Sequence, residues 1–198
     1  MDENYNSGQN PTVTIGDYQD EESSRKDFDL FVSKTELFEI IGKGTTMGIK
    51  GIMIQPLPDM DNKHHYLIDR ILYPTQKLID LGWVKGLIGV EIKKSGHKVG
   101  PSLSQMLDYL RCAWIIPQKN IKVLIDYCFL WPLDKCGGCT ASIMAQNRIG
   151  GVCIKYSPHS EYFRLQFSIG EQFIIEHYLN QNRTEIKNLQ TGSKTGSR

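Results

Sequence analysis

The sequence has no run of about 18 apolar residues, and its amino terminus has no basic segment followed by an apolar one. The first absence argues against a membrane-spanning helix, and the second argues against secretion by a cleaved leader. Cysteine is scarce, and its count of five is odd, which does not suit a framework of paired disulfides. We therefore expect a protein of the reducing cytoplasm, with thiols that are free or metal-bound and no membrane partner.

A strong excess of charge of one sign is also missing, because 23 Lys and Arg residues stand against 22 Asp and Glu residues. The balance conceals a segregation: residues 1–24 hold six acids and no Lys or Arg, and residues 181–198 hold four basic residues and one acid. The remainder, residues 25–180, holds 19 basic and 15 acidic residues. This mildly positive body suits an anionic partner only weakly, so charge alone does not nominate nucleic acid.

The length of 198 residues has room for one domain, and an apolar content of 40% with a charged content of 23% is typical of globular proteins. Residues 1–26 are rich in Asn, Ser, Gly and acids, which predicts a disordered acidic leader. The polar residues 181–198 predict a disordered tail. Residues 27–180 are expected to form the domain.

The segment 87–93 predicts a buried strand, because it is short, rich in Ile and Val, and bounded by Gly86 and Ser95-Gly96. Alternation along a strand places Ile88, Val90 and Ile92 on one face. Glu91 and Lys93 then share the opposite face, with Gly89 leaving space beside them.

Residues 65–72 also read as a strand, and Asp69 is a charge within this otherwise apolar run. Such a charge is costly unless it is paired or binds a metal. If the two strands are neighbours in one sheet, Asp69, Glu91 and Lys93 converge. Asp59 and Asp80 are rivals for Asp69, but they fall in segments that read as a turn and as a helix or turn, where a ligand is held less rigidly.

The segment 102–114 predicts an amphipathic helix with a core stripe that includes Leu103, Met106 and Leu110. Gln105 and Tyr109 are four residues apart and therefore lie together on an adjacent stripe. The loop before this helix clusters Lys94, His97 and Lys98, a composition that suits contacts with backbone phosphates.

Two carboxylates and a lysine are the side chains that metal-assisted hydrolysis of a phosphodiester requires. Asp69, then Glu91-Ile92-Lys93, then Gln105-x-x-x-Tyr109 resembles the PD-(D/E)XK nuclease superfamily, in the branch of RecB-type nuclease domains and lambda-type exonucleases. The resemblance rests on about 50 of the 198 residues. The Glu-x-Lys triplet alone is common by chance, whereas the ordered set is moderately specific.

The resemblance implies a deoxyribonuclease with a restriction-endonuclease-like fold, an α/β arrangement in which helices flank a mixed central sheet. Asp69, Glu91 and the backbone carbonyl of Ile92 would hold Mg²⁺ or Mn²⁺, and Lys93 would assist the attacking water. Gln105 and Tyr109 would position the DNA strand, with Lys94, His97 and Lys98 contacting it. A glutamate on the first core helix often joins such sites.

That first helix is expected over residues 33–41, because Ser33-x-x-Glu36 has the pattern of a capping box and apolar residues follow it. Glu36 would then serve the cap, which leaves Glu39 as the added metal ligand. A surface salt bridge is the other reading of Glu39. The small size suits a stand-alone enzyme of a phage or mobile element, with a homo-oligomer left open.

Structural readings stand beside these functional ones. Glu91 and Lys93 also suit a solvated ion pair on an antiparallel sheet. Asp69 also suits a pair with Arg70 or with a neighbouring lysine, and Ser102-x-x-Gln105 suits a second capping box. The runner-up function is a nucleic-acid-binding module that keeps the fold without catalysis.

A third reading is a protein centred on the Cys136-Gly-Gly-Cys139 pair, which is half of a zinc site. Completing a Zn²⁺ or iron–sulfur site would need ligands from Cys112, Cys128, Cys153 or His159, and this spacing does not match the separated cysteines of the family's cluster-bearing members. We therefore expect no metal there.

The remaining segments predict a central strand over 121–131, a helix over 140–147, strands over 152–156 and 160–169, and a final helix over 173–179. Together with the elements above, this order favours an α/β fold.

Overall fold

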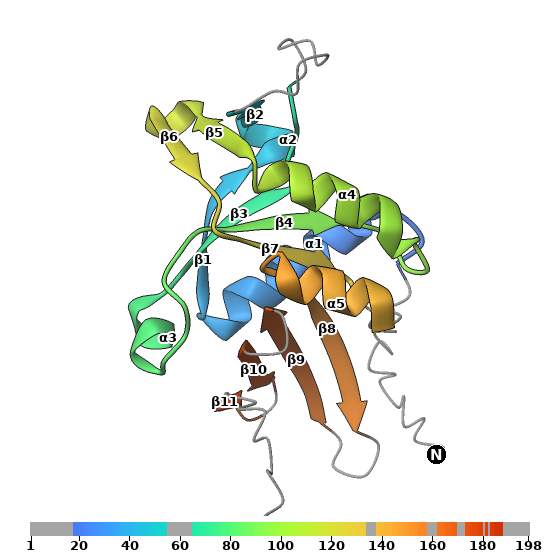
Figure 1. The fold of residues 1–198 in the computed structure, drawn as a ribbon. Helices are drawn as coiled ribbons and strands as arrows, with labels where there is room; N and C mark the ends of the chain where they lie inside the picture. Colours follow the sequence, from blue (N-terminus) through green and yellow to red (C-terminus); the bar gives the residue numbers. More distant parts are fainter. Residues whose placement is uncertain are drawn as a thin grey trace, which may run out of the picture.

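The computed structural model describes residues 18–54, 65–133, 138–157, 162–169, 173–179, 181 and 183–187. Over these ranges the chain is a mixed α/β protein with an eight-stranded sheet, strongly curled into a half-barrel, and a small antiparallel sheet at one end (Figure 1). The helical segments are α1 (Glu21–Thr35), α2 (Gly44–Met47), α3 (Gln76–Asp80), α4 (Val99–Tyr109), η1 (Pro117–Lys119, a 3-10 turn) and α5 (Gly138–Gln146).

The large sheet is mixed. In spatial order its strands are β1 (Phe38–Lys43), β3 (Arg70–Pro74), β4 (Ile88–Ile92), β7 (Tyr127–Trp131), β8 (Ile149–Ser157), β9 (Tyr162–Ile169), β10 (Phe173–Tyr178) and β11 (Arg183–Lys187). Strands β4, β7 and β8 run parallel, and the other pairings are antiparallel. The small sheet has the order β2 (Lys50–Met53), β5 (Cys112–Ile116) and β6 (Ile121–Leu124).

Helices cover both faces of the central strands, which explains why β4 is buried at every position and is apolar except for Glu91. On one face, α1 packs Phe28 and Phe31 into the cluster that contains Val90. On the other face, α4 and α5 contribute Met106 and Met144 to a second cluster. The expected α/β fold with helices flanking a mixed sheet is confirmed at this level.

The prediction of a strand over 87–93 is confirmed, and so is its alternation. Ile88, Val90 and Ile92 face the cluster that includes α1, and Glu91 faces α4. The neighbouring strand β3 pairs antiparallel with β4 and begins at Arg70, so it is shorter than predicted. Asp69 therefore lies immediately before the strand rather than inside it.

The expected disordered leader over 1–26 is wrong for its last residues, because α1 begins at Glu21. Asp20 caps the helix by accepting a 2.8 Å hydrogen bond from the Ser23 amide, and acidic residues in the first turn suit the helix dipole. The expected helix over 33–41 is also wrong. Glu36 caps the carboxyl end of α1 in the left-handed region, with φ of 54°, and residues 38–43 form β1.

The helix predicted over 102–114 begins and ends earlier, at Val99 and Tyr109. Pro101 is tolerated because the first turn of a helix has no intrahelical partners for its amides. Residues 112–116 form β5 instead of a last helical turn. Because Lys98 is the residue that precedes the helix, Ser102 is not its cap, and the expected capping box at Gln105 is absent.

The single strand predicted over 121–131 is two strands in different sheets, β6 and β7. Asp126 lies at the break, where its carboxylate accepts a 2.8 Å hydrogen bond from the Leu87 amide. The helix predicted over 173–179 is strand β10, which is hydrogen-bonded on both sides, and residues 183–187 of the expected tail form β11. Tertiary pairing has overridden the local pattern in both places.

In the described part of the chain, every helix is too short or too polar to cross a membrane.

Candidate active site

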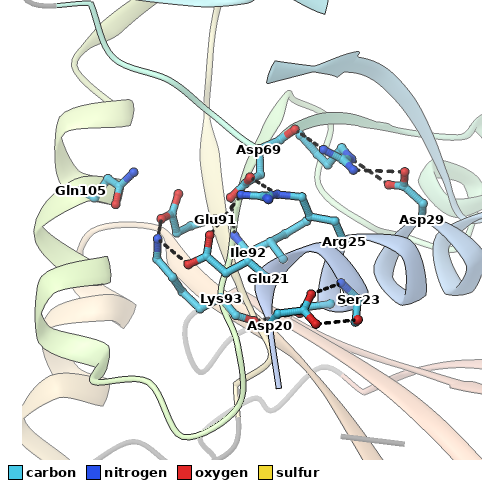
Figure 2. A network of polar contacts seen from close by, with 12 residues as sticks. Asp20, Glu21, Ser23, Arg25, Asp29, Asp69, Glu91, Ile92, Lys93 and Gln105 are labelled. Carbon is cyan, nitrogen blue, oxygen red and sulfur yellow. Dashed lines mark hydrogen bonds and ion pairs between the residues drawn. The ribbon is translucent and has the colours of Figure 1, made fainter. Parts of the chain in front are cut away.

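One pocket of about 170 Å³ opens between α1, α4 and the ends of β3 and β4. Five of the predicted site residues line it, namely Asp69, Glu91, Lys93, Gln105 and Tyr109. The other lining residues are Arg25, Gly44, Leu67 and Ile68. The expected convergence of the Asp and the Glu-x-Lys triplet is therefore observed (Figure 2).

Asp69 is fixed through both of its carboxylate oxygens. Oδ2 accepts a 2.8 Å hydrogen bond from the backbone amide of Ile92, and Oδ1 accepts one of 2.8 Å from Nε of Arg25. Ile92, whose carbonyl is an expected ligand, thus contributes its amide to the network. Since Arg70 pairs with Val90, Asp69 comes one residue beyond the ladder, beside Glu91.

Glu91 is almost completely buried, with 1% of its surface exposed. Its Oε1 lies 2.5 Å from Nζ of Lys93, and its Oε2 accepts a 2.5 Å hydrogen bond from the Tyr109 hydroxyl. Burial raises the pKa of Glu91, and the charge of Asp69 acts in the same direction, against the opposing effects of Lys93 and Tyr109. Glu91 is thus a carboxylate whose charge needs compensation.

Lys93 supplies that compensation. Burial disfavours its ammonium, but the hydrogen bond and charge of Glu91, helped by Glu21 and Asp69, outweigh this effect and raise the pKa of Lys93. The side chain is therefore protonated at neutral pH. In this state it can stabilise negative charge or orient a water molecule, and it cannot accept a proton.

Gln105 and Tyr109 form a relay to Glu91. The Nε2 group of Gln105 donates a 2.6 Å hydrogen bond to the Tyr109 hydroxyl, which the four-residue spacing on α4 permits. Burial, followed by the nearby Glu91 carboxylate, raises the pKa of Tyr109, so its hydroxyl stays a neutral donor. Tyr109 is 1% exposed and packs edge-on against Trp114, with ring centroids 5.2 Å apart. In this arrangement its ring is shielded from a nucleic-acid base, and it acts by holding Glu91.

Two residues on α1, Glu21 and Arg25, belong to the network of the site although the expected leader over 1–26 includes them. Arg25 binds Asp69 through Nε, and its NH2 group lies 3.1 Å from Oε2 of Glu21. Glu21 also lies 3.6 Å from Nζ of Lys93, so it connects the two cations of the pocket (Figure 2). The Asp20-x-x-Ser23 cap, with acids at the helix start, is the sequence signal that predicts this helix.

A second cluster on α1 holds the neighbouring strands. Asp29 accepts hydrogen bonds of 2.7 Å from Nε of Arg70 and from Nζ of Lys43. Burial alone would raise the pKa of Asp29, but these two cations outweigh it and lower the pKa. Arg70 also donates to the backbone carbonyl of Asp69. The alternative of an Asp69–Arg70 side-chain pair is therefore wrong, since the carboxylate that Arg70 binds belongs to Asp29.

Glu21 on α1 contacts the pocket residues Arg25 and Lys93, whereas Glu39 is not among the residues that line the pocket. Glu39 is exposed on β1, where it pairs with Tyr73 of β3. The end of this strand pair that lies next to Asp69 is the Lys43–Arg70 pair, four positions further along β1. Glu36 is exposed at the end of α1. Of the rival aspartates, Asp80 accepts a hydrogen bond from Gln76 on α3, and Asp59 lies outside the described residues.

The basic loop after β4 is next to the pocket without lining it. Lys94 and Lys98 are exposed, and Nδ1 of His97 lies 3.1 Å from the Lys94 carbonyl. The loop is held by Ser95, which exchanges hydrogen bonds with the backbone of Tyr18. Contact of these three basic residues with DNA remains a prediction.

The four cysteines that the structure describes are free thiols on four different elements. Cys112 and Cys128 are buried in different strands, and burial raises the pKa of each thiol, that of Cys112 to about 11. Cys139 is exposed at the start of α5, and Cys153 lies on β8. Cys136 and His159 lie outside the described residues.

The donor set of the pocket fits a hard divalent cation. Carboxylate oxygens are the ligands that Mg²⁺ and Mn²⁺ prefer, and one or two carboxylates commonly suffice because water and substrate phosphate complete the shell. The four carboxylate oxygens of Asp69 and Glu91 contact Arg25, Lys93, Tyr109 and the Ile92 amide. Two of these partners are cations on long side chains, which a metal ion could replace as the compensating charge. Among the described residues, no group of three His, Cys, Asp or Glu side chains is arranged to hold a metal.

Comparisons with protein-family models, with curated proteins and with solved structures found no match to this chain.

Proposed function

We propose that this protein is a metal-dependent deoxyribonuclease that hydrolyses DNA phosphodiester bonds on a restriction-endonuclease-like core. The observation that supports it most is the convergence of Asp69, Glu91 and Lys93 in one pocket from the ends of two adjacent strands. The Gln-x-x-x-Tyr pair adds support, because Gln105 donates a hydrogen bond to the Tyr109 hydroxyl and that hydroxyl donates one to Glu91.

The chain's own residues would divide the work as follows. Asp69, Glu91 and the carbonyl of Ile92 would hold Mg²⁺ or Mn²⁺, which supplies a bound water of lowered pKa and polarises the phosphoryl oxygen. Lys93 would orient the attacking water and stabilise the negative charge that develops on the phosphate. Arg25 adds a second positive charge to the pocket wall, which suits a phosphate group.

A second candidate function is a non-catalytic nucleic-acid-binding module. Its support is the closed network of the pocket, in which Arg25 and Lys93 already neutralise both carboxylates without any other cation. Such a network also suits a structural role for the same residues.

The test is incubation of the purified protein with labelled single-stranded, duplex and branched DNA in Mg²⁺, in Mn²⁺ or in EDTA. A nuclease cleaves at least one of these with a divalent ion and none in EDTA. Lys93→Ala is expected to abolish cleavage and to retain DNA binding. Lys85→Ala, which removes an exposed lysine from the loop before β4, is the matched control and should cleave normally.

Thermal melting of both variants shows whether the fold is kept, and Lys93→Gln repeats the test with a side chain that can still donate to Glu91. Cleavage that persists in EDTA, or in folded Lys93 variants, contradicts the proposal. Binding by the wild-type protein without cleavage in either metal favours the second candidate.

A further inference from the structure

The small sheet turns one face to the core and the other to solvent. Trp114 and Cys112 on β5 are fully buried on the inner face, beside Met53 and Val123 of the flanking strands. Ala113 and Ile115 lie on the opposite face, where Ala113 is buried with 3% of its surface exposed and Ile115 is partly exposed. The two outward rows that cross the sheet are Lys50–Ile115–Lys122 and Ile52–Ala113–Leu124.

The outer face, defined by Lys50, Ile52, Ile115, Lys122 and Leu124, combines exposed apolar and cationic side chains. Ile52 and Ile115 are each 37% exposed, and Leu124 is 57% exposed. Both lysines are exposed as well. Branched apolar side chains grouped on an open sheet face are typical of a contact surface and are uncommon on a face that meets only water.

The two segments that contain the three strands of this sheet carry charge of one sign only. Residues 40–54 and 109–125 contain no Asp or Glu, and they contain Lys43, Lys50, Arg111, Lys119 and Lys122. Lys43 is bound to Asp29. Among the described residues, no carboxylate forms an ion pair with Lys50, Lys119 or Lys122. The outer face therefore complements an anionic partner.

The outer face is continuous with the pocket. Tyr66 forms an antiparallel bridge with Gly51 through two hydrogen bonds, of 2.8 and 3.0 Å, which adds a short edge to β2. Extending this register by one residue places Leu67 opposite Lys50, in line with the first outward row. Leu67 is 64% exposed and also lines the pocket. The row therefore runs from the lip of the pocket across three strands.

We infer that this outer face holds a nucleic-acid strand and leads it to the pocket. Lys50 and Lys122 contact successive parts of the phosphate backbone, since two strand spacings separate them by roughly 10 Å, the axial length of about three base pairs. Ile115 and Leu124 pack against sugars, and Leu67 packs against the base at the pocket lip, as apolar side chains do in strand-distorting proteins. The inference takes its ligand from the proposed function, but the contacts need no catalysis.

Binding of a fluorescent DNA single strand and duplex, measured by anisotropy in EDTA over a series of salt concentrations, tests the inference apart from cleavage. Lys50→Gln with Lys122→Gln is expected to weaken binding about tenfold and to reduce the slope of log affinity against log salt by about 1.5, the loss expected for two phosphate contacts. Leu67→Ala is expected to weaken binding without changing that slope, because an apolar contact releases no counterions. The matched control, Lys34→Gln with Lys85→Gln, removes two exposed lysines at the other end of the β1–β3 pair and should change neither quantity.

If the wild-type protein binds and cleaves DNA and the two double variants bind DNA with equal affinity, the inference is overturned and the proposed nuclease activity is retained. Binding that depends on Lys50 and Lys122 without cleavage in any metal overturns the nuclease and leaves the inference standing. A wild-type dimer in light scattering that Leu124→Ser converts to a monomer of unchanged DNA affinity assigns the face to a second copy of the chain and also overturns the inference. Absence of DNA binding overturns both proposals.

Discussion

The backbone amide of Ile92 donates a 2.8 Å hydrogen bond to Oδ2 of Asp69. This bond connects β4 to the residue that precedes β3, beyond the last backbone pair of the two strands, Arg70 with Val90. The aspartate is therefore fixed by the end of the neighbouring strand rather than by a loop. Glu91 precedes Ile92 on that same strand. A rigid placement of both carboxylates is what a metal or substrate site requires.

The hydroxyl of Tyr109 is expected to matter through Glu91. Tyr109→Phe keeps the ring against Trp114 but removes the 2.5 Å hydrogen bond to a buried carboxylate. We expect the free energy of unfolding to fall by about 1–3 kcal/mol and cleavage to slow by about tenfold or more. Urea denaturation and single-turnover cleavage measure the two effects. Tyr73→Phe, on β3 outside the pocket lining, is the control, and equal unfolding free energies for the two variants would argue against the relay.

Arg25 is expected to compete with a divalent cation for Asp69. Arg25→Gln removes the 2.8 Å ion pair and leaves a largely buried carboxylate with less compensation. The variant should melt at a lower temperature than the wild-type protein in EDTA. Because a ligand stabilises the state that binds it, Mn²⁺ should then raise the melting temperature of the variant by more than that of the wild type. Lys26→Gln, which alters an exposed pair with Glu22 on the same helix, provides the comparison. Identical responses to Mn²⁺ in all three proteins would contradict this prediction.

Glu21, and not Glu39, is expected to be the glutamate that serves the site. Glu21→Gln removes a charge near Nζ of Lys93 and the partner of Arg25, so we expect metal-dependent cleavage to fall about 10–100-fold. Glu39→Gln changes an exposed side chain on β1 and should leave cleavage unchanged. Titration of cleavage rate against Mg²⁺ concentration compares the variants. The reverse order of effects would restore the original assignment of Glu39.

The Asp29 cluster predicts a specific pH dependence of stability. Because the folded-state pKa of Asp29 is lowered, its ionised form stabilises the fold above the ordinary Asp pKa of about 3.9, and this contribution is lost as the pH falls through the lowered pKa. Near neutral pH, Asp29→Asn should reduce the free energy of unfolding by about 3 kcal/mol, since it leaves the buried Arg70 without its charge partner.

Urea denaturation of the wild-type protein and Asp29→Asn at several pH values tests this prediction, with Asp27→Asn on the same helix as the control. The difference between wild type and Asp29→Asn should shrink below about pH 4. A difference that stays constant into strongly acidic solution would mean that Asp29 does not act through its charge.

Strand β4 and the site motif could be predicted because local pattern and tertiary role agree there. The run around Val90 is apolar on one face, and its other face carries Glu91 beside a glycine. The two-residue alternation of a strand therefore determines which residues lie on each face. The four-residue spacing of Gln105 and Tyr109 likewise determines their contact on any helix. The pairing of β3 with β4 then brings Asp69 next to Glu91 in the pocket.

The remaining errors come from segments whose structure is decided at a distance. Residues 173–178 have a pattern that suits a helix, but hydrogen bonds from β9 and β11 on both sides make them a strand. The local pattern predicts that Trp114 ends a helix over 102–114, yet Trp114 lies on β5, and its indole N–H donates a hydrogen bond to the carbonyl of Tyr109. At the amino terminus, acidic composition concealed a helix whose cap at Asp20 was visible in the sequence.

Helix α1 gives the pocket more than its two ionic partners, because the hydroxyl of Ser24 donates a 2.7 Å hydrogen bond to the carbonyl of Lys93. A recombinant fragment trimmed to begin at Asp27 would therefore keep every strand of the large sheet but lose Glu21, Ser24 and Arg25, which contact Lys93 and Asp69. Expression boundaries for this protein should be drawn ahead of Tyr18, whose backbone holds Ser95.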